Sequence, residues 1–226
     1  MSVRCGRTAR GKPYPSLPGY EVIPAWSRGR APYKQLSPML LGPIIVNEPL
    51  YNGQPLPGFT ISANGQDAQA VIKIFENYWQ GSKIYNIDLI NPNNPVTVNN
   101  LKPEYFRRRA EIFASDKGIR RALPKAKYGV PISSFYGGHI MDYITSRKLV
   151  YCPYYYFLVK NNPVYLQIKN IHDQGKNLII VGPDGYDENI ELTSQILTQL
   201  LNRTDIIFGH ELVLCCMLLN YRVWEN

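Results

Sequence analysis

Proline is the residue that most constrains how the first part of this chain can fold. Ten of residues 1–60 are proline. Proline fixes φ and lacks a backbone N–H, so a long helix is not expected in this stretch. The sequence therefore predicts an extended Pro-rich N-terminal segment, with one short strand near residues 42–46.

From residue 67 onwards, apolar side chains recur at the spacing of a helix. Residues 116–138 are rich in glycine and proline and are expected to form a loop, and Thr193 is expected to cap a helix. The best strand candidate is the β-branched run 177–181, which ends at Gly182. Helices are expected at residues 67–85, 103–115, 139–150, 153–160, 163–173, 195–201 and 209–223.

These elements predict an α+β fold, a predominantly helical single domain with a small sheet. We expect a basic Pro-rich arm over residues 1–40 and a domain over residues 41–226. Apolar residues make up 45% of the chain and charged residues 19%, which is enough apolar surface for a folded core. No apolar run approaches the length of a membrane helix, and the first thirty residues lack an apolar signal core. We therefore expect a cytoplasmic protein without a membrane partner, in the host cytoplasm or the virion if it is viral.

Positive charge is concentrated at the N-terminus. Residues 1–36 contain seven Lys or Arg against one acid, Glu21, or +6 of the formal net charge of +8. Such a charge distribution is typical of a surface that meets phosphate, often in DNA or RNA, although a solvated tail that only aids solubility has the same composition. The candidate nucleic-acid-binding residues are Arg4, Arg7, Arg10, Lys12, Arg28 and Arg30.

Cysteine and histidine give no sign of a metal site. The four cysteines form no CxxC pair and have no histidine at zinc spacing. Cys215 and Cys216 lie in an apolar helical run, where thiols usually act as small hydrophobic side chains. The three histidines lie in no nucleophile motif, and no Walker loop or dinucleotide fingerprint is present. We predict neither a metal nor a cofactor.

The segment 76–83 contains the first candidate site. On a helix, Glu76, Gln80 and Lys83 share one face, and Trp79 lies beside Lys83. A carboxylate, an amide and an ammonium on an otherwise apolar helix either line a pocket or face water as a salt-bridged surface.

Two further candidates lie towards the C-terminus. Asp184, Gly185 and Tyr186 follow the predicted strand, where α/β proteins often bind ligands, although Pro-Asp-Gly is also a common plain turn. His210 opens the last helix beside Glu211. This helix end suits a phosphate, or the two side chains merely cap the helix.

The pattern Glu76-x-Tyr78-Trp79-Gln80-x-x-Lys83 resembles the signature of the NADAR (YbiA-like) superfamily. The order of the elements downstream agrees with that family over roughly residues 40–222. The N-terminal segment from Trp26 to Pro43 resembles more closely an uncharacterised set of proteins from phages and large DNA viruses.

The resemblance implies an α+β domain that hydrolyses an N-glycosidic bond in ADP-ribose or ribose-phosphate compounds, including ADP-ribosylated nucleobases or nucleotides. It implies a nucleotide-like or ADP-ribose-type ligand. Such hydrolysis develops oxocarbenium character on the ribose, which a carboxylate stabilises. The implied catalytic residues are Glu76, Lys83 and Asp184, and the implied substrate-binding residues are Trp79, Gln80, Tyr186, His210 and Arg107.

Two alternatives stay open. His210 stands where the family usually has asparagine, so the chain is also compatible with an inactive member that only binds ADP-ribose. The basic N-terminus, the tyrosine content and the eight Lys or Arg of residues 107–127 favour a different class. That class is a non-catalytic nucleic-acid-binding or viral structural protein.

Overall fold

The computed structural model describes residues 1–225 and has an α+β fold with 36% helix and 19% strand. In this range the strands form three sheets of three strands each. The chain divides into two compact units. The terminal unit comprises residues 1–41 and 147–226, and the middle unit comprises residues 42–146.

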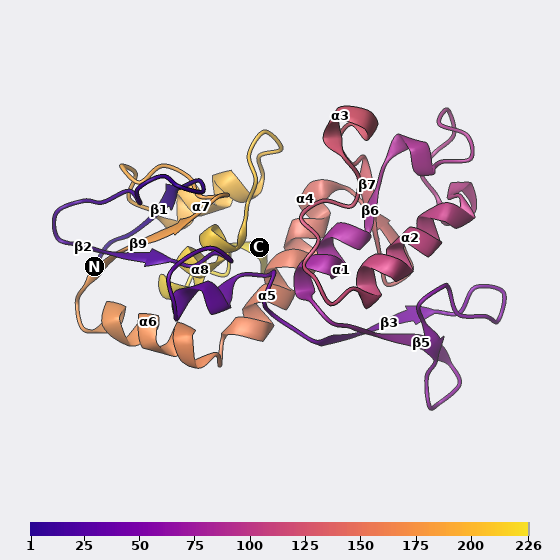
Figure 1. Cartoon of the computed structure of the whole chain (residues 1–226), viewed down its shortest axis with the longest axis horizontal. Helices are drawn as coiled ribbons and strands as arrows, with labels where there is room; N and C mark the ends of the chain where they lie inside the picture. The colour runs from indigo at the N-terminus through magenta and orange to yellow at the C-terminus, as the bar shows by residue number, and fades with distance from the viewer. Residues whose placement is uncertain (226) are drawn as a thin grey trace. The chain divides into compact units, whose positions relative to one another are not determined.

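The terminal unit is built on a parallel sheet. Its central strand β9 (Asn177–Gly182) lies between β1 (Val3–Arg7) and β2 (Tyr20–Pro24) (Figure 1). Cys5 and Ile23 both lie opposite Ile180, and all three side chains are buried. The predicted strand 177–181 is confirmed, because an uninterrupted β-branched run is what a strand buried on both faces requires.

Four helices complete this unit: α5 (Cys152–Val159), α6 (Pro163–Asp173), α7 (Ser194–Leu201) and α8 (His210–Leu218). All four predictions are confirmed, although α8 ends several residues early. Every residue of α8 is buried, as its apolar sequence indicates. Thr193 caps α7, its side-chain oxygen accepting a hydrogen bond from the N–H of Ile196 at 3.2 Å. Two short 3₁₀ helices, Tyr33–Leu36 and Val223–Glu225, and a π-helical turn, Arg147–Tyr151, are also present.

The N-terminal residues differ from the prediction of an extended segment. They form no long helix, as expected, but they supply two of the three strands of the parallel sheet. The prolines do not prevent this, because they lie outside β1 and only at the last position of β2. The division into an arm of residues 1–40 and a domain of residues 41–226 remains a prediction.

The middle unit contains two antiparallel sheets. One has the order β3-β5-β4, with β3 (Ile44–Pro49), β4 (Thr60–Ile61) and β5 (Asp67–Ile72). The other has the order β6-β7-β8, with β6 (Lys83–Ile84), β7 (Ser133–Tyr136) and β8 (His139–Met141). Its helices are α1 (Phe75–Gly81), α2 (Pro103–Ala114), α3 (Lys125–Tyr128) and α4 (Tyr143–Ser146), with 3₁₀ turns at Asn86–Asp88 and Val98–Asn100.

Three predictions in this unit are corrected. The helix expected over residues 67–85 is the strand β5, the short helix α1 and the strand β6. Residues 67–72 form a strand because Ala68, Ala70 and Ile72 are buried and alternate with less buried neighbours against β3. The helix expected over 139–150 begins with strand β8. The expected loop 116–138 includes α3 and β7. The helix expected over 103–115 is confirmed as α2, and the strand expected near 42–46 is confirmed as β3.

The core of the middle unit encloses an ion pair. Arg109 of α2 donates two hydrogen bonds of 2.7 Å to the two carboxylate oxygens of Glu48 on β3. The guanidinium carbon lies 4.7 to 5.6 Å from the centroids of four phenylalanine rings: Phe59, Phe106, Phe113 and Phe135. These contacts join α2 to the β3-β5-β4 sheet through buried charges.

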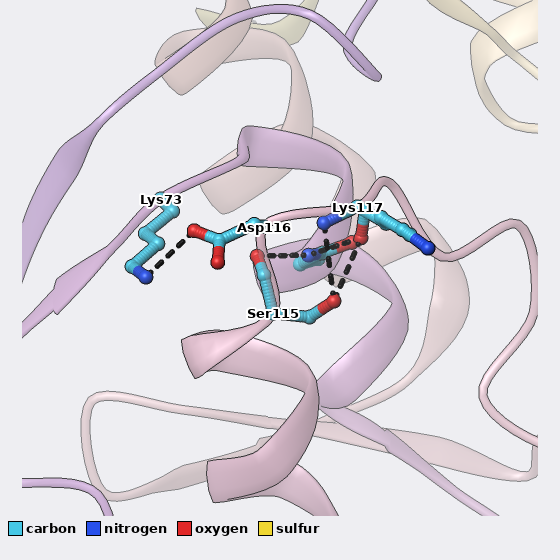
Figure 2. A network of polar contacts seen from close by, with 5 residues as sticks. Lys73, Ser115, Asp116 and Lys117 are labelled. Carbon is cyan, nitrogen blue, oxygen red and sulfur yellow. Dashed lines mark hydrogen bonds and ion pairs between the residues drawn. The ribbon is translucent and has the colours of Figure 1, made fainter.

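The loop after α2 is fastened to α1 and to the segment between β5 and α1. Lys73 Nζ lies 2.6 Å from an oxygen of Asp116, and the Ser115 hydroxyl bonds with the backbone of Lys117 (Figure 2). The side chain of Asn77, on α1, donates to the carbonyls of Ser115 and Lys117 and accepts the N–H of Ile119 at 2.7 Å. This network sets the position of α1, the helix with the first candidate site.

Candidate functional sites

Glu76 and Gln80 form the contact expected of a helix, whereas Lys83 does not share their helix face as predicted, because α1 ends at Gly81 and Lys83 lies in β6. Gln80 Nε2 donates a hydrogen bond of 2.8 Å to Glu76 Oε1, one turn earlier. Lys83 Nζ lies 5.6 Å from the centre of the Trp79 ring, within the range of a cation–π contact. The amide of Gln80 therefore orients the Glu76 carboxylate, and the lysine lies over the indole.

Aromatic side chains of the middle unit surround Trp79. Its ring stacks on Tyr136 at a centroid distance of 6.2 Å and an interplanar angle of 19°, and lies at 6.1 Å from Tyr143. Burial raises the pKa of Tyr136 well above its ordinary value, so its hydroxyl stays protonated. Trp79 and Tyr136 are both buried, whereas Glu76, on the same helix as Trp79, is partly exposed.

The three consecutive arginines of α2 point to three different acids, as their positions on a helix predict. Arg107 is exposed and pairs with Glu104 at 2.8 Å. Arg108 forms two bonds with Asp88, and Arg109 is the buried partner of Glu48. Arg107 is the one whose guanidinium remains at the surface, so of the three it stays the candidate for phosphate.

A second group of candidates lies at the carboxyl end of the parallel sheet. Because β1, β9 and β2 run in the same direction, the residues that follow them meet at one edge, where ligands usually bind in parallel sheets. The N–H of Thr8 donates to Gly182 O at 3.0 Å, and the N–H of Ala25 donates to Val181 O at 3.1 Å. Asp184 follows directly on the turn after β9 and is half-buried.

Glu211 is the residue at this edge that sequence reasoning treated only as part of a helix cap. It is fully buried on the first turn of α8, and its Oε1 accepts the backbone N–H of Asp184 at 3.3 Å. Burial raises the pKa of the Glu211 carboxyl, the neighbouring His210 opposes this, and the charge of Asp184 adds to it. The only sequence signal for Glu211 was its position next to His210 at the start of an otherwise apolar helix.

His210 has both ring nitrogens close to oxygens of the terminal unit. Nε2 lies 2.7 Å from the carbonyl oxygen of Ala25, and Nδ1 lies 3.2 Å from Glu211 Oε2. The side chain is buried against Tyr155, with the ring centroids 5.8 Å apart. A role for His210 in holding substrate therefore requires it to give up one of these contacts.

The basic residues of the N-terminus divide into two kinds. Arg4 donates to the Tyr20 hydroxyl and to the carbonyls of Glu188 and Asn189, so it fastens the loop after β9. Arg7 donates from Nε to the carbonyl of Gly185 at 3.1 Å, near the half-buried Tyr186. The remaining candidates are exposed at the surface of the terminal unit: Arg10, Lys12, Arg28 and Arg30.

The structure therefore brings the candidate residues together in two sets, each described within its own unit. Glu76, Trp79, Gln80 and Lys83 lie together on or beside α1. The other set comprises Asp184 and His210, with the newly recognised Glu211 between them.

No protein-family model matches the chain, and neither does any curated protein or solved structure. The resemblance to the NADAR superfamily therefore stays a prediction. Within residues 1–225, no three side chains of His, Cys, Asp or Glu are grouped so as to hold a metal ion. No helix in the same range is long and apolar enough to cross a bilayer.

Proposed function

We propose that this chain hydrolyses an N-glycosidic bond in an ADP-ribose or ribose-phosphate compound, with Glu76 as the carboxylate that faces the sugar. The observation that carries the proposal is the arrangement on α1. The hydrogen bond from Gln80 orients the carboxylate, and Trp79, on the same helix, stacks on Tyr136. A carboxylate near aromatic side chains suits a substrate in which a flat base is attached to a ribose, because the carboxylate can face the sugar and an aromatic ring can contact the base.

The proposed reaction depends on the positive charge that develops on the ribose. As the bond between C1′ and the base nitrogen breaks, its electron pair leaves with the base and the ribose gains oxocarbenium character. The Glu76 carboxylate stabilises that positive charge, and water then adds to C1′ and gives its proton to the nitrogen of the departed base. Lys83 lies over Trp79 and supplies the positive charge that a phosphate of the substrate requires. The proposal uses side chains of the middle unit alone.

The test compares Glu76→Gln with Glu111→Gln, a matched change of an exposed glutamate on α2. Glutamine at position 76 can still accept the hydrogen bond from Gln80, so the fold is expected to be retained. We expect Glu76→Gln to lower the rate of ADP-ribose release from an ADP-ribosylated nucleoside by about 100-fold or more, with Glu111→Gln unchanged. Full activity of Glu76→Gln, or no turnover by the wild-type chain, would contradict the proposal.

A binding measurement separates loss of chemistry from loss of ligand. ADP-ribose and ribose 5-phosphate are expected to raise the melting temperature of the wild-type chain, because a ligand that binds only the folded state stabilises it. Glu76→Ala is expected to reduce that shift. If the chain is an inactive ADP-ribose binder, the shift persists while hydrolysis is absent from the wild type as well.

The exposed cations of the terminal unit favour a second candidate function, binding of DNA or RNA. Arg10 and Lys12 lie exposed in the loop between β1 and β2. Because residues 1–36 contain two strands of the sheet, deletion of this segment would unfold the unit and would not test binding. Arg10→Ala with Lys12→Ala is expected to lower the slope of log affinity against log salt by about 0.9 per lost phosphate contact.

The matched control is Lys176→Ala, which removes an exposed lysine just before β9, at the opposite end of the parallel sheet. Binding that is independent of salt, or an equal effect of both changes, would exclude a specific role of the β1–β2 loop.

A further inference from the structure

The segment between α2 and β7 carries a concentrated positive charge. We call its residues 117–132 the basic loop, which contains five Lys or Arg, whereas no acid occurs between Asp116 and Asp142. All five cations are exposed, and none forms an ion pair with another residue of the range 1–225. They are Lys117, Arg120, Arg121, Lys125 and Lys127.

Two acids of the same unit are already neutralised by other cations. Asp116, directly before the basic loop, lies 2.6 Å from Lys73 Nζ, and the Lys117 side chain points away from this network (Figure 2). Asp88 accepts two hydrogen bonds from Arg108. These acids compensate other cations, so the charge of the basic loop stays available to a partner outside the chain.

Hydrogen bonds hold the basic loop at both ends. At its start, the side chain of Asn77 on α1 bonds to the backbone of Lys117 and Ile119. At its end, the N–H of Ile132 donates to the carbonyl of Ile84 at 2.8 Å. Helix α3 lies between these anchors, at the margin of the middle unit (Figure 1). A loop that is already ordered loses less conformational entropy when it binds.

The basic loop also exposes two aliphatic side chains directly after its cations. Val130 is 58% exposed and Ile132 is 37% exposed. The aromatic ring of this stretch, Tyr128, is half-buried, with Lys127 Nζ 5.1 Å from its centroid. Nucleic acid uses cations and exposed aromatic rings, and aliphatic side chains add nothing to contacts with phosphate. A membrane surface uses cations and aliphatic side chains together, because the first bind anionic headgroups and the second enter the boundary with the acyl chains.

We propose that the basic loop binds the surface of a membrane that contains anionic lipids. Lys125 and Lys127 contact the headgroups, and Val130 and Ile132 enter the boundary between headgroups and acyl chains. The expectation of no membrane partner rested on the lack of a spanning segment and a signal core, neither of which surface binding needs. The inference goes beyond the proposed function, because it uses none of the side chains assigned to hydrolysis or to nucleic-acid binding.

The experiment measures co-sedimentation of the full chain with lipid vesicles. Vesicles of equal parts phosphatidylserine and phosphatidylcholine are expected to bind the wild-type chain more than about a hundredfold more tightly than vesicles of phosphatidylcholine alone. Binding to the anionic vesicles is expected to weaken as the salt concentration rises, because salt screens exposed charges.

The contribution of charge is tested with Lys125→Gln combined with Lys127→Gln. Each lysine near an anionic bilayer contributes about 1 kcal/mol, so the loss of two is expected to weaken binding to the anionic vesicles about 30-fold. The matched control is Lys34→Gln with Lys176→Gln, which removes the same charge from exposed positions of the terminal unit and should bind normally.

The contribution of the aliphatic side chains is tested with Val130→Thr combined with Ile132→Thr, which keeps both residues β-branched. Binding to the anionic vesicles is expected to weaken about tenfold, because less apolar surface enters the bilayer. Ile207→Thr, at an exposed isoleucine of the terminal unit, is the control and should bind normally. Unchanged vesicle binding by the Val130 and Ile132 variant would overturn the assignment to a membrane.

A different partner would be revealed by the same variants. If the Lys125 and Lys127 variant binds a single-stranded DNA oligonucleotide more weakly and binds vesicles normally, the loop binds nucleic acid and the inference is wrong. No binding of the wild type to anionic vesicles would also overturn it, as would equal effects of the lysine pair and its control. Hydrolysis is measured without vesicles, so failure of the Glu76 proposal and failure of membrane binding are seen separately.

Discussion

Each unit contains a buried glutamate, and the two glutamates are held in opposite ways. Glu48 in the middle unit receives two charge-assisted bonds of 2.7 Å from Arg109 and is enclosed by aromatic rings. Glu211 in the terminal unit receives one longer bond, from the N–H of Asp184, and its Oε2 lies 3.2 Å from Nδ1 of His210. Burial raises the pKa of both carboxyls, but a guanidinium opposes the shift only for Glu48.

The difference in their contacts suits the two glutamates to different roles, a structural one for Glu48 and a chemical one for Glu211. A carboxylate whose lone pairs are occupied by a guanidinium has nothing left to offer a ligand, and its role is to join α2 to β3. A carboxylate that accepts one long bond from a backbone N–H and lies beside a histidine retains the capacity to bind or to transfer a proton. Burial alone therefore does not mark a functional acid, whereas the partners of the acid do.

The largest effect on stability is expected from breaking the buried ion pair between Arg109 and Glu48. Arg109→Met leaves Glu48 buried without its counter-charge and is expected to lower the free energy of unfolding by about 3–5 kcal/mol. Arg109→Met combined with Glu48→Leu removes both charges and is expected to recover most of that loss. Urea denaturation measures all three chains.

Arg107→Met is the control for this prediction, because it removes the adjacent but exposed pair with Glu104. Its cost is expected to stay below about 1 kcal/mol. If the double variant is no more stable than Arg109→Met alone, the destabilisation comes from lost packing of the guanidinium, and the contrast between the two glutamates is weakened.

A smaller effect is expected from filling the space that Gly182 leaves for Glu211. Gly182→Ala places a methyl group against the Glu211 carboxylate and is expected to lower the free energy of unfolding by about 1–3 kcal/mol. In the double variant with Glu211→Ala the clash is absent, so the effects of the two changes should not add. Additive effects in this double-mutant cycle would show that the glycine serves another purpose.

The smallest effect concerns pH. The folded chain holds the Glu211 proton more tightly than the unfolded chain, where the pKa is near 4.5. The resulting stability is complete below about pH 4.5 and is lost as the pH rises through the raised pKa. The loss is about 1.4 kcal/mol for each pH unit that separates the folded from the unfolded pKa. His210 and Asp184 face this carboxyl and modulate the loss.

Glu211→Gln cannot release this proton. As the pH rises through this range, the melting temperature of Glu211→Gln is therefore expected to rise relative to that of the wild type. Parallel curves for the two chains would show that Glu211 titrates normally in the folded state.

The sequence by itself predicts those helices and strands that depend on interactions between residues close together in the chain. The apolar spacing along α2 and α6, the β-branched run of β9 and the apolar composition of α8 were sufficient to place them. The oxygen of Thr193 was recognisable as a cap because it bonds only three residues ahead. The neighbours on α1 followed in the same way, since residues four apart on a helix meet.

Tertiary structure alone decided the rest. Strand β5 looks helical by its spacing and becomes a strand because β3 pairs with it. Residues 3–7 and 20–24 become strands because β9, more than 150 residues later, supplies their hydrogen bonds. The ring of His210, which lies beside Glu211, contacts the carbonyl of Ala25, 185 residues away in sequence. A single sequence cannot show this, because the charge of a buried acid is set by the donors and acceptors that folding places beside it.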